Sequence, residues 1–236
     1  MQRARRAARL RAACAVLVVL GGLALSGCRS QPGVAYYLGG TRVSESRVDQ
    51  LAHDAKAGVD EFNRRSGGEQ AQPEPAPGGD DIVAALVAHD LTGRVADELG
   101  ARPAPGTGTE QAQGPKSEYT RLRDETLANV EAIAQALHNQ SPPAPGDGVV
   151  RTAFDRAVAA QVAGANQYDQ FKQAILQSPD FVLGSAVRDR VLAAAAGLHV
   201  TVNPRYLPAE FPLLTLASNA SGRSFVALTL PIGAHG

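Results

Sequence analysis

The segment VAYYLGGTRVSESRVDQL, residues 34–51, decides the fold predicted for this chain. Residues 34–37 and 41–43 are rich in β-branched and aromatic side chains and flank the turn residues Gly39 and Gly40, a pattern typical of a short hairpin. Ser44 follows as the cap of a helix. The segment therefore predicts two short strands that lead directly into an amphipathic helix.

Apolar residues at helical spacing continue along the chain and predict a mainly α fold, a bundle of about five amphipathic helices. The apolar stripes are interpreted as the core of this bundle rather than as a binding groove. The fourth helix has a candidate break near Gly164. The five helices are expected at about residues 44–65, 80–99, 117–138, 149–175 and 178–197.

Three Pro- and Gly-rich stretches, at residues 66–80, 100–117 and 141–148, separate these helices and are expected to form loops. The helical domain is expected to span residues 34–206. Residues 207–236 then form a C-terminal tail, in which Ser224 to Leu230 carries a weak strand pattern.

Residues 1–27 have the features of a targeting segment, with an Arg-rich start and an apolar run from Ala12 to Leu25. The run ends in Leu25-Ser26-Gly27-Cys28, which resembles the bacterial lipobox. This motif predicts a lipoprotein signal peptide cleaved between Gly27 and Cys28, with Cys28 carrying acyl chains such as palmitate. An ordinary cleaved signal peptide with an incidental cysteine is the alternative. Residues 28–33 would be a tether at the extracytoplasmic face of the cell membrane, since two or more acyl chains anchor a protein stably.

The charge of the chain excludes several classes of function. The 23 basic and 23 acidic residues balance, but five arginines precede Cys28, so the remainder carries a formal charge of −5. An acidic chain with 5% aromatic residues is a poor candidate for nucleic-acid binding. The five histidines show no metal-binding spacing, and no nucleophile, phosphate-binding or dinucleotide motif is present in the sequence. We therefore expect no cofactor, no metal and no catalytic residues.

A second informative segment is LHVTVNPRY, residues 198–206, in which alternating residues predict a strand after the last helix. Strands so distant in sequence are expected to pair with each other and to close the domain. The residues Asn203, Arg205 and Tyr206 either end this strand beside Pro204 or form a turn that faces a partner protein.

Segments 34–51 and 198–206 together resemble the actinobacterial lipoproteins related to the N-terminal, chaperone domain of SurA. In that family the early strand and helix open the domain and the late helix and strand close it. The resemblance implies a foldase-like lipoprotein that binds unfolded or extended exported polypeptides without catalysis. Many relatives carry a parvulin domain with peptidyl-prolyl isomerase activity, and this chain shows no pattern for one. Prolyl isomerisation and a structural or scaffold role in the envelope are the alternatives.

Overall fold

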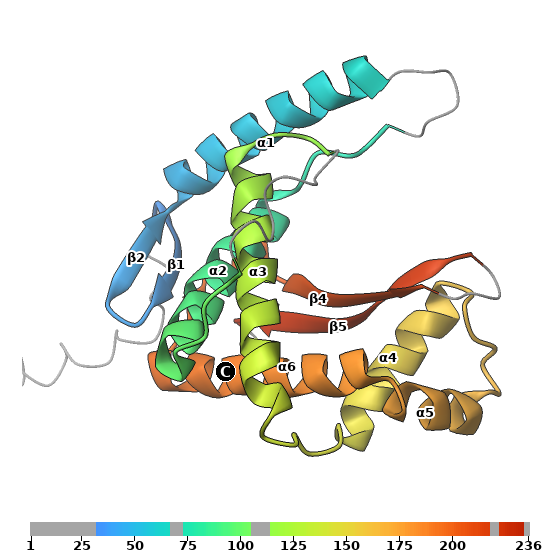
Figure 1. Ribbon diagram of the computed structural model, residues 1–236. Helices are drawn as coiled ribbons and strands as arrows, with labels where there is room; N and C mark the ends of the chain where they lie inside the picture. The colour runs from blue at the N-terminus through green and yellow to red at the C-terminus, as the bar shows by residue number, and fades with distance from the viewer. Residues whose placement is uncertain (1–31, 67–72, 105–113, 218–221, 234–236) are drawn as a thin grey trace, which may run out of the picture. The chain divides into compact units, whose positions relative to one another are not determined.

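The computed structural model describes residues 32–66, 73–104, 114–217 and 222–233, and residues from Gly33 onward form one compact unit. This unit is mainly helical with short antiparallel strands, as the sequence predicts (Figure 1). In chain order, its elements are β1 (Val34–Leu38), β2 (Thr41–Ser44), α1 (Glu45–Ser66), α2 (Gly79–Leu99), α3 (Glu118–His138), α4 (Asp147–Ala159), α5 (Tyr168–Leu176), α6 (Pro179–Leu198), β3 (Thr201–Val202), the 3₁₀ turn η1 (Pro204–Tyr206), β4 (Ala209–Ala217) and β5 (Ser224–Ile232).

The first sheet has the strand order β2-β1-β3, with both pairs antiparallel. Tyr36 of β1 lies opposite Val43 of β2 on one side and Val202 of β3 on the other. The predicted pairing of strands from both ends of the domain is therefore confirmed. Asn203 reinforces it, because its backbone N–H donates to the carbonyl of Ala35 at 2.8 Å.

Helix α2 is the centre of the core, and α1, α3, α6 and the β4–β5 hairpin all pack against it (Figure 1). Ile82, Val83, Val87, Leu91 and Val95 of α2 are fully buried. Each such side chain contributes about 1.5–3 kcal/mol when it leaves water. The apolar stripe that the sequence shows on this helix is therefore a core stripe, as expected.

The predicted fourth helix is divided in two, and the break near Gly164 is confirmed. Helix α4 ends at Ala159 and α5 begins at Tyr168. Gln161 has a φ of 57°, a left-handed conformation that stops an α-helix. The rings of Tyr168 and Phe171 then pack edge-on against Phe154 of α4, with centroids 5.3 and 5.4 Å away. The apolar pattern across residues 149–175 therefore arises from two helices that share one aromatic cluster.

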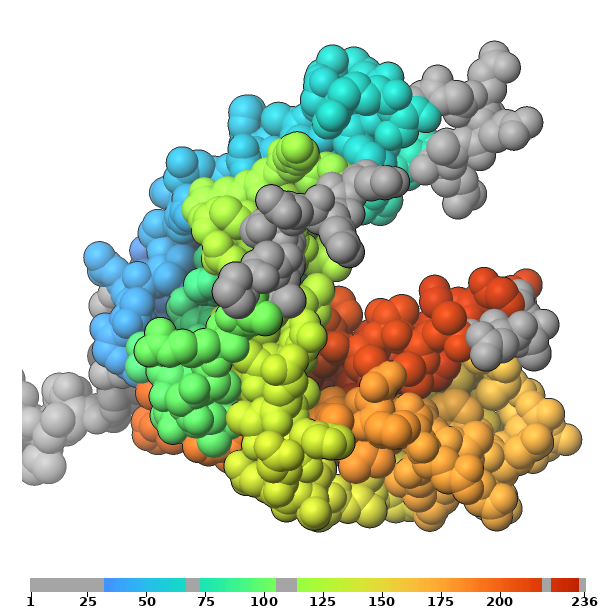
Figure 2. All heavy atoms as spheres, viewed as in Figure 1, coloured from blue at the N-terminus to red at the C-terminus, as the bar shows by residue number. Residues whose placement is uncertain are grey.

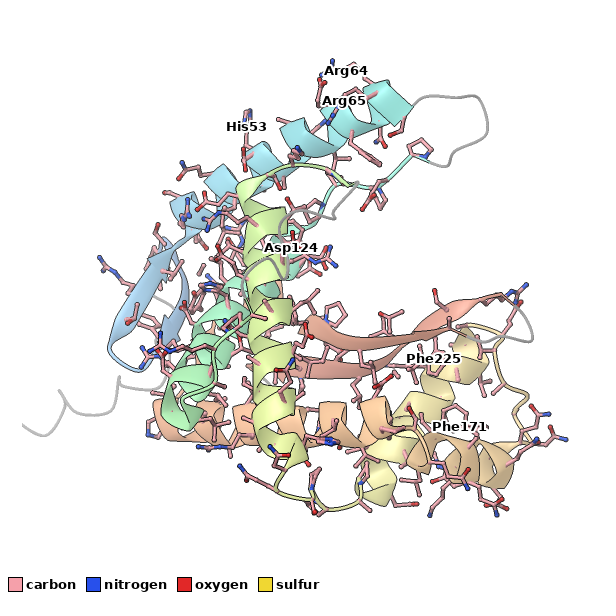
Figure 3. All side chains as sticks on the ribbon, in the orientation of Figure 1. His53, Arg64, Arg65, Asp124, Phe171 and Phe225 are labelled. Carbon is pink, nitrogen blue, oxygen red and sulfur yellow. The ribbon has the colours of Figure 1, made fainter. Side chains whose placement is uncertain are left out.

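The same cluster extends to the hairpin. The rings of Phe171 in α5 and Phe225 in β5 contact each other in a tilted arrangement, with centroids 6.2 Å apart (Figure 3). Helix α5 is thereby fixed to both α4 and the second sheet.

The predicted strand at residues 198–202 is shorter than expected. Helix α6 continues to Leu198, and His199 ends it in a left-handed conformation with a φ of 49°. Only Thr201 and Val202 remain for β3. His199 is therefore the C-cap of α6.

The boundary predicted at Tyr206 does not hold, because residues 209–217 and 224–232 form an antiparallel hairpin on the same core. Phe211, Leu228 and Leu230 are buried in it. The strand expected at residues 224–230 is present as β5. Strand β4 was not predicted, because Pro208 and Pro212 interrupt its pattern and proline is a poor strand former.

Candidate functional site

An open cleft lies between α1, the extended segment 73–78, the start of α3 and the first residues of β4. Figure 2 shows the surface hollowed between the end of α1 with the segment that follows it and the hairpin. The cleft encloses about 260 Å³. Its apolar lining comes mainly from one tyrosine, one valine and several prolines: Tyr119, Val59, Pro75, Pro77, Pro115 and Pro212.

The segment 73–78 is held beside α1 by one asparagine. The side-chain oxygen of Asn63 accepts the backbone N–H of Glu74, and its nitrogen donates to the carbonyl of the same residue, both at 3.0 Å. An amide that pairs with both backbone groups of a residue replaces the partner strand that an extended chain needs. One wall of the cleft is therefore a proline-rich main chain fixed in an extended form.

The start of α3 is placed against α1 by a close backbone approach. A Cβ atom on Gly58 of α1 would lie 2.5 Å from the carbonyl oxygen of Lys116, so only glycine fits there. One turn earlier, the carboxylate of Asp54 accepts the backbone N–H of Glu118 at 2.7 Å. Ser117 caps α3 by accepting the N–H of Thr120. These contacts position Tyr119, one of the two aromatic residues that line the cleft.

Charges of both signs surround this tyrosine. Partial burial raises the pKa of Tyr119; Asp81 and Asp80 raise it further, while Arg123 opposes them. The Arg123 guanidinium lies 5.8 Å from the centre of the Tyr119 ring. The lining holds three carboxylates, those of Glu74, Asp81 and Glu210, against this one guanidinium. An extended apolar segment that carries positive charge suits such a surface.

A second pocket of about 340 Å³ lies on the other side of the hairpin, between β5, α4 and α6. Arg156 in it binds the carboxylate of Glu210 at 2.6 Å and the hydroxyl of Thr229 at 2.9 Å. Arg188 donates from Nε to the carbonyl of Thr229 at 3.2 Å. Both guanidiniums thus bind the hairpin itself, so the residues of this pocket hold the hairpin against α4 and α6.

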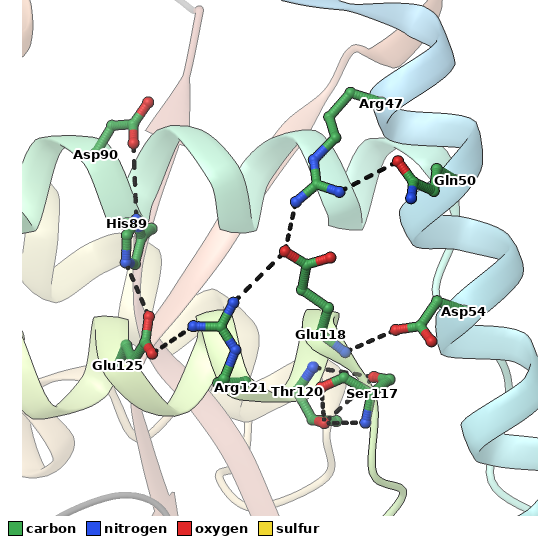
Figure 4. Close-up of polar contacts among 10 residues, drawn as sticks. All are labelled: Arg47, Gln50, Asp54, His89, Asp90, Ser117, Glu118, Thr120, Arg121 and Glu125. Carbon is green, nitrogen blue, oxygen red and sulfur yellow. Dashed lines mark hydrogen bonds and ion pairs between the residues drawn. The ribbon is translucent and has the colours of Figure 1, made fainter.

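A chain of charged side chains links α1, α2 and α3 on another face (Figure 4). Arg47 of α1 pairs with Glu118 of α3. On α3, Arg121 pairs with Glu125 at 2.6 Å, and Glu125 reaches His89 of α2 at 3.2 Å. No residue of this chain lines the cleft. We interpret it as a structural link between the three helices.

His89 makes this link sensitive to pH. The neighbouring carboxylate of Asp90 is the main cause that raises the pKa of His89, and Glu125 adds to it, whereas partial burial opposes both. A pKa raised in the folded state means that protonated His89 stabilises the fold. This stabilisation is fully present below the unfolded pKa of about 6.5 and is lost as the pH rises through the folded value.

We predict that His89→Gln removes this pH dependence. The free energy of unfolding of the wild type is expected to fall as the pH rises from 6 to 8, and that of the variant to fall less. Urea denaturation at pH 6, 7 and 8 measures the difference. The control is His53→Gln, since His53 is exposed on the outer face of α1 (Figure 3) and should leave the slope as it is. Equal slopes in wild type and His89→Gln would contradict the prediction.

The residues of the predicted partner-facing turn serve mainly inside the fold. The Asn203 side chain accepts the N–H of Arg205 and donates to the carbonyl of Val34 at 3.1 Å and to the carboxylate of Glu45 at 3.0 Å. Tyr206 is buried, with 4% of its surface exposed. Only Arg205 is exposed, and it pairs with Glu45 at 3.2 Å. Of the two interpretations of this turn, the structure therefore agrees with the end of a strand, tied to β1 and α1.

The predicted cleavage site, Gly27 and Cys28, and the lipidation of Cys28 lie outside the described residues. Within the residues that are described, no group of three or more His, Cys, Asp or Glu side chains is placed to hold a metal ion. None of the helices in the same ranges has the length and apolar character needed to cross a bilayer.

Comparison with known proteins gives no relative: no family model, no curated protein and no solved structure matches this chain.

The cleft was not among the sites predicted from the sequence. Its prolines lie in stretches expected to be loops, and Pro212 lies in the expected tail. The available signals were the proline run at residues 73–77 and, separately, Tyr119 in the first turn of the later helix α3. Only the fold shows that this run and that tyrosine face each other.

Proposed function

We propose that this protein is a non-catalytic, chaperone-like lipoprotein that binds extended segments of unfolded, exported polypeptides in the cleft. The observation that carries the proposal is the cleft itself, an open cleft in which prolines, Tyr119 and the first residues of β4 lie beside carboxylates and other polar groups. Prolines and a tyrosine give apolar contact that does not depend on one client sequence.

The chemistry of the occupant follows from the charges of the lining. Glu210 is neutralised by Arg156, but Glu74 and Asp81 remain against the single guanidinium of Arg123. We therefore propose clients whose extended segments combine apolar residues with lysine or arginine. A rise in salt concentration is expected to weaken binding, since exposed charges are screened.

The location belongs to the same proposal. A lipid-anchored Cys28, joined to β1 by a short tether, would keep the cleft at the extracytoplasmic face of the cell membrane, where exported chains arrive unfolded. The resemblance of segments 34–51 and 198–206 to the SurA N-terminal domain supports this role.

The test is the binding of a fluorescein-labelled ten-residue peptide of alternating leucine, threonine and lysine, followed by fluorescence anisotropy. We predict that Tyr119→Ala weakens binding about tenfold, because truncation of a central aromatic contact is costly. The matched control is Leu127→Ala, which truncates an exposed side chain (39% exposed) of the same helix outside the cleft. Equal affinities for both variants would place binding elsewhere.

The purified chain is also expected to delay the aggregation of a chemically unfolded client, and Tyr119→Ala to delay it less. In a protease-coupled assay with a prolyl tetrapeptide, no acceleration over the spontaneous rate is expected. Failure both to bind the peptide and to delay aggregation would overturn the proposal. Co-purification with one stoichiometric partner instead of many clients would favour the scaffold role.

A further inference from the structure

The β4–β5 hairpin has two outer edges, and the structure shows how the β5 edge is used. The Arg188 side chain donates from Nε to the carbonyl oxygen of Thr229 at 3.2 Å. This carbonyl therefore points away from β4, toward α6. Helix α4 packs along the same strand. The outer edge of β5 is thus covered.

The direction of the Thr229 carbonyl also fixes the pattern of the ladder. Thr229 lies opposite Pro212, which has no backbone N–H, so this pair exchanges no hydrogen bonds. Hydrogen-bonded and non-hydrogen-bonded pairs alternate in an antiparallel ladder. The register is regular from Pro212 back to Ala209, so the pair Glu210–Pro231 is also non-hydrogen-bonded. The second proline, Pro231, fits that position because it lacks an N–H as well.

Three backbone groups of β4 consequently point away from β5: the N–H and C=O of Glu210 and the C=O of Pro212. Glu210, Phe211 and Pro212 line the cleft, and no residue of β5 does. Across the described ranges, none of these three groups is hydrogen-bonded to another segment of the chain. The cleft therefore contains one free donor and two free acceptors in the arrangement of a strand edge.

We infer that a polypeptide segment held in the cleft pairs through its own main chain with the edge of β4 at Glu210 and Pro212. This inference rests on the proposed function and names its binding mode. An extended segment can accept from the N–H of Glu210 and donate to the carbonyls of Glu210 and Pro212, as in strand addition to a sheet edge. Main-chain bonds are the same for every sequence, which suits a protein with many clients.

Pro212 limits this pairing. Since it offers no N–H, a bound segment cannot extend the full ladder past this residue, and the register of β4 shifts immediately afterwards. A proline and a bulge are the features by which natural edge strands avoid indefinite association. The pairing is thus confined to a short stretch inside the cleft, and bound clients can be released.

The experiment compares two variants that lose the same carboxylate. Glu210→Ala keeps the backbone N–H, whereas Glu210→Pro removes it at a position whose N–H makes no bond to β5. We predict that Glu210→Pro binds the ten-residue peptide about three- to tenfold more weakly than Glu210→Ala, the effect of one hydrogen bond. Thermal unfolding of both variants shows whether the hairpin is retained.

A second measurement does not depend on the variants. The wild-type chain is titrated with the same peptide in two forms, in which either the odd or the even backbone nitrogens are methylated. Only alternate N–H groups of an added strand face its partner, so one form should bind about three- to tenfold more weakly and the other should not.

Each outcome has a distinct meaning. If the wild-type chain neither binds the unmethylated peptide nor delays aggregation, the proposed function itself fails. If it delays aggregation without binding this peptide, only the inference is overturned. If it binds, but the two methylated forms bind equally and Glu210→Pro equals Glu210→Ala, the cleft is used without strand addition and the inference is overturned. Association of the chain with itself that Glu210→Pro abolishes would identify a second copy as the occupant and would likewise overturn it.

Discussion

Phe181→Ala is expected to lower the free energy of unfolding by about 3–5 kcal/mol, the largest effect predicted for this protein. Phe181 lies in the first turn of α6 and is fully buried in the core. The substitution removes a whole aromatic ring and leaves a cavity that a helix start, fixed by the cap Ser178 and by Pro179, cannot easily fill. Urea denaturation with a fixed slope measures the change.

The matched control is again Leu127→Ala. Leu127 is 39% exposed, and surface substitutions of this kind change stability by about 0.5 kcal/mol or less. A domain of this size has a total stability of about 5–15 kcal/mol, so the difference between the two variants is readily measured. A loss below about 1 kcal/mol for Phe181→Ala would contradict the tight packing of α6 against the hairpin and α2.

Gly58→Ala is expected to lower the free energy of unfolding by about 1–3 kcal/mol, although alanine normally favours helices. The added methyl group would lie 2.5 Å from the carbonyl oxygen of Lys116, a backbone atom that cannot rotate away. Helix α1 and the start of α3 must then separate. Since these two elements form walls of the cleft, the affinity for the ten-residue peptide is expected to fall as well.

The control for this variant is Gly197→Ala. Gly197 lies near the end of α6, and a Cβ atom there would meet no atom within 4 Å. Alanine at such a site is expected to stabilise the helix by about 0.5–1 kcal/mol and to leave peptide binding as it is. If both variants stabilise the protein, the close approach of α1 to Lys116 is not present in solution.

The sequence predicted those parts of the fold that depend on local pattern. Ser44 and Ser178 accept backbone N–H groups at the starts of α1 and α6, and Gly100 ends α2 with a φ of 62°, as their residue types indicate. The pairing of β1 with β3 followed from one global argument, that two distant short strands each need a partner. Strand β4 was not predicted because a proline such as Pro212 is tolerated only at a non-hydrogen-bonded position, and the sequence does not show which positions those are.

The candidate cleft could not be predicted from the sequence, for a different reason. Its walls come from four separate segments, and none of these segments has a sequence pattern that by itself indicates a binding site. In the sequence, Pro75 and Pro77 lie in a predicted loop, Tyr119 lies on the apolar face of a predicted helix, and Pro212 lies in the predicted tail. Conversely, Tyr206 looked like an interface anchor, yet its ring lies against Gly79, where a Cβ atom would be 3.0 Å from it. Whether an aromatic residue faces core or solvent depends on the packing of distant segments.

The pairing of β1 with β3 has a consequence for how the protein is made. The Asn203 side chain that binds the carbonyl of Val34 is 169 residues away from it along the chain. Contacts between residues so far apart in the sequence form slowly, because a long loop must close before the contact is made. During synthesis, the first strand, with its apolar Tyr36 and Leu38, lacks its second neighbour until residues 201 and 202 of β3 have been made. Until then, this protein, which is proposed to bind unfolded segments, itself contains an incompletely paired apolar strand.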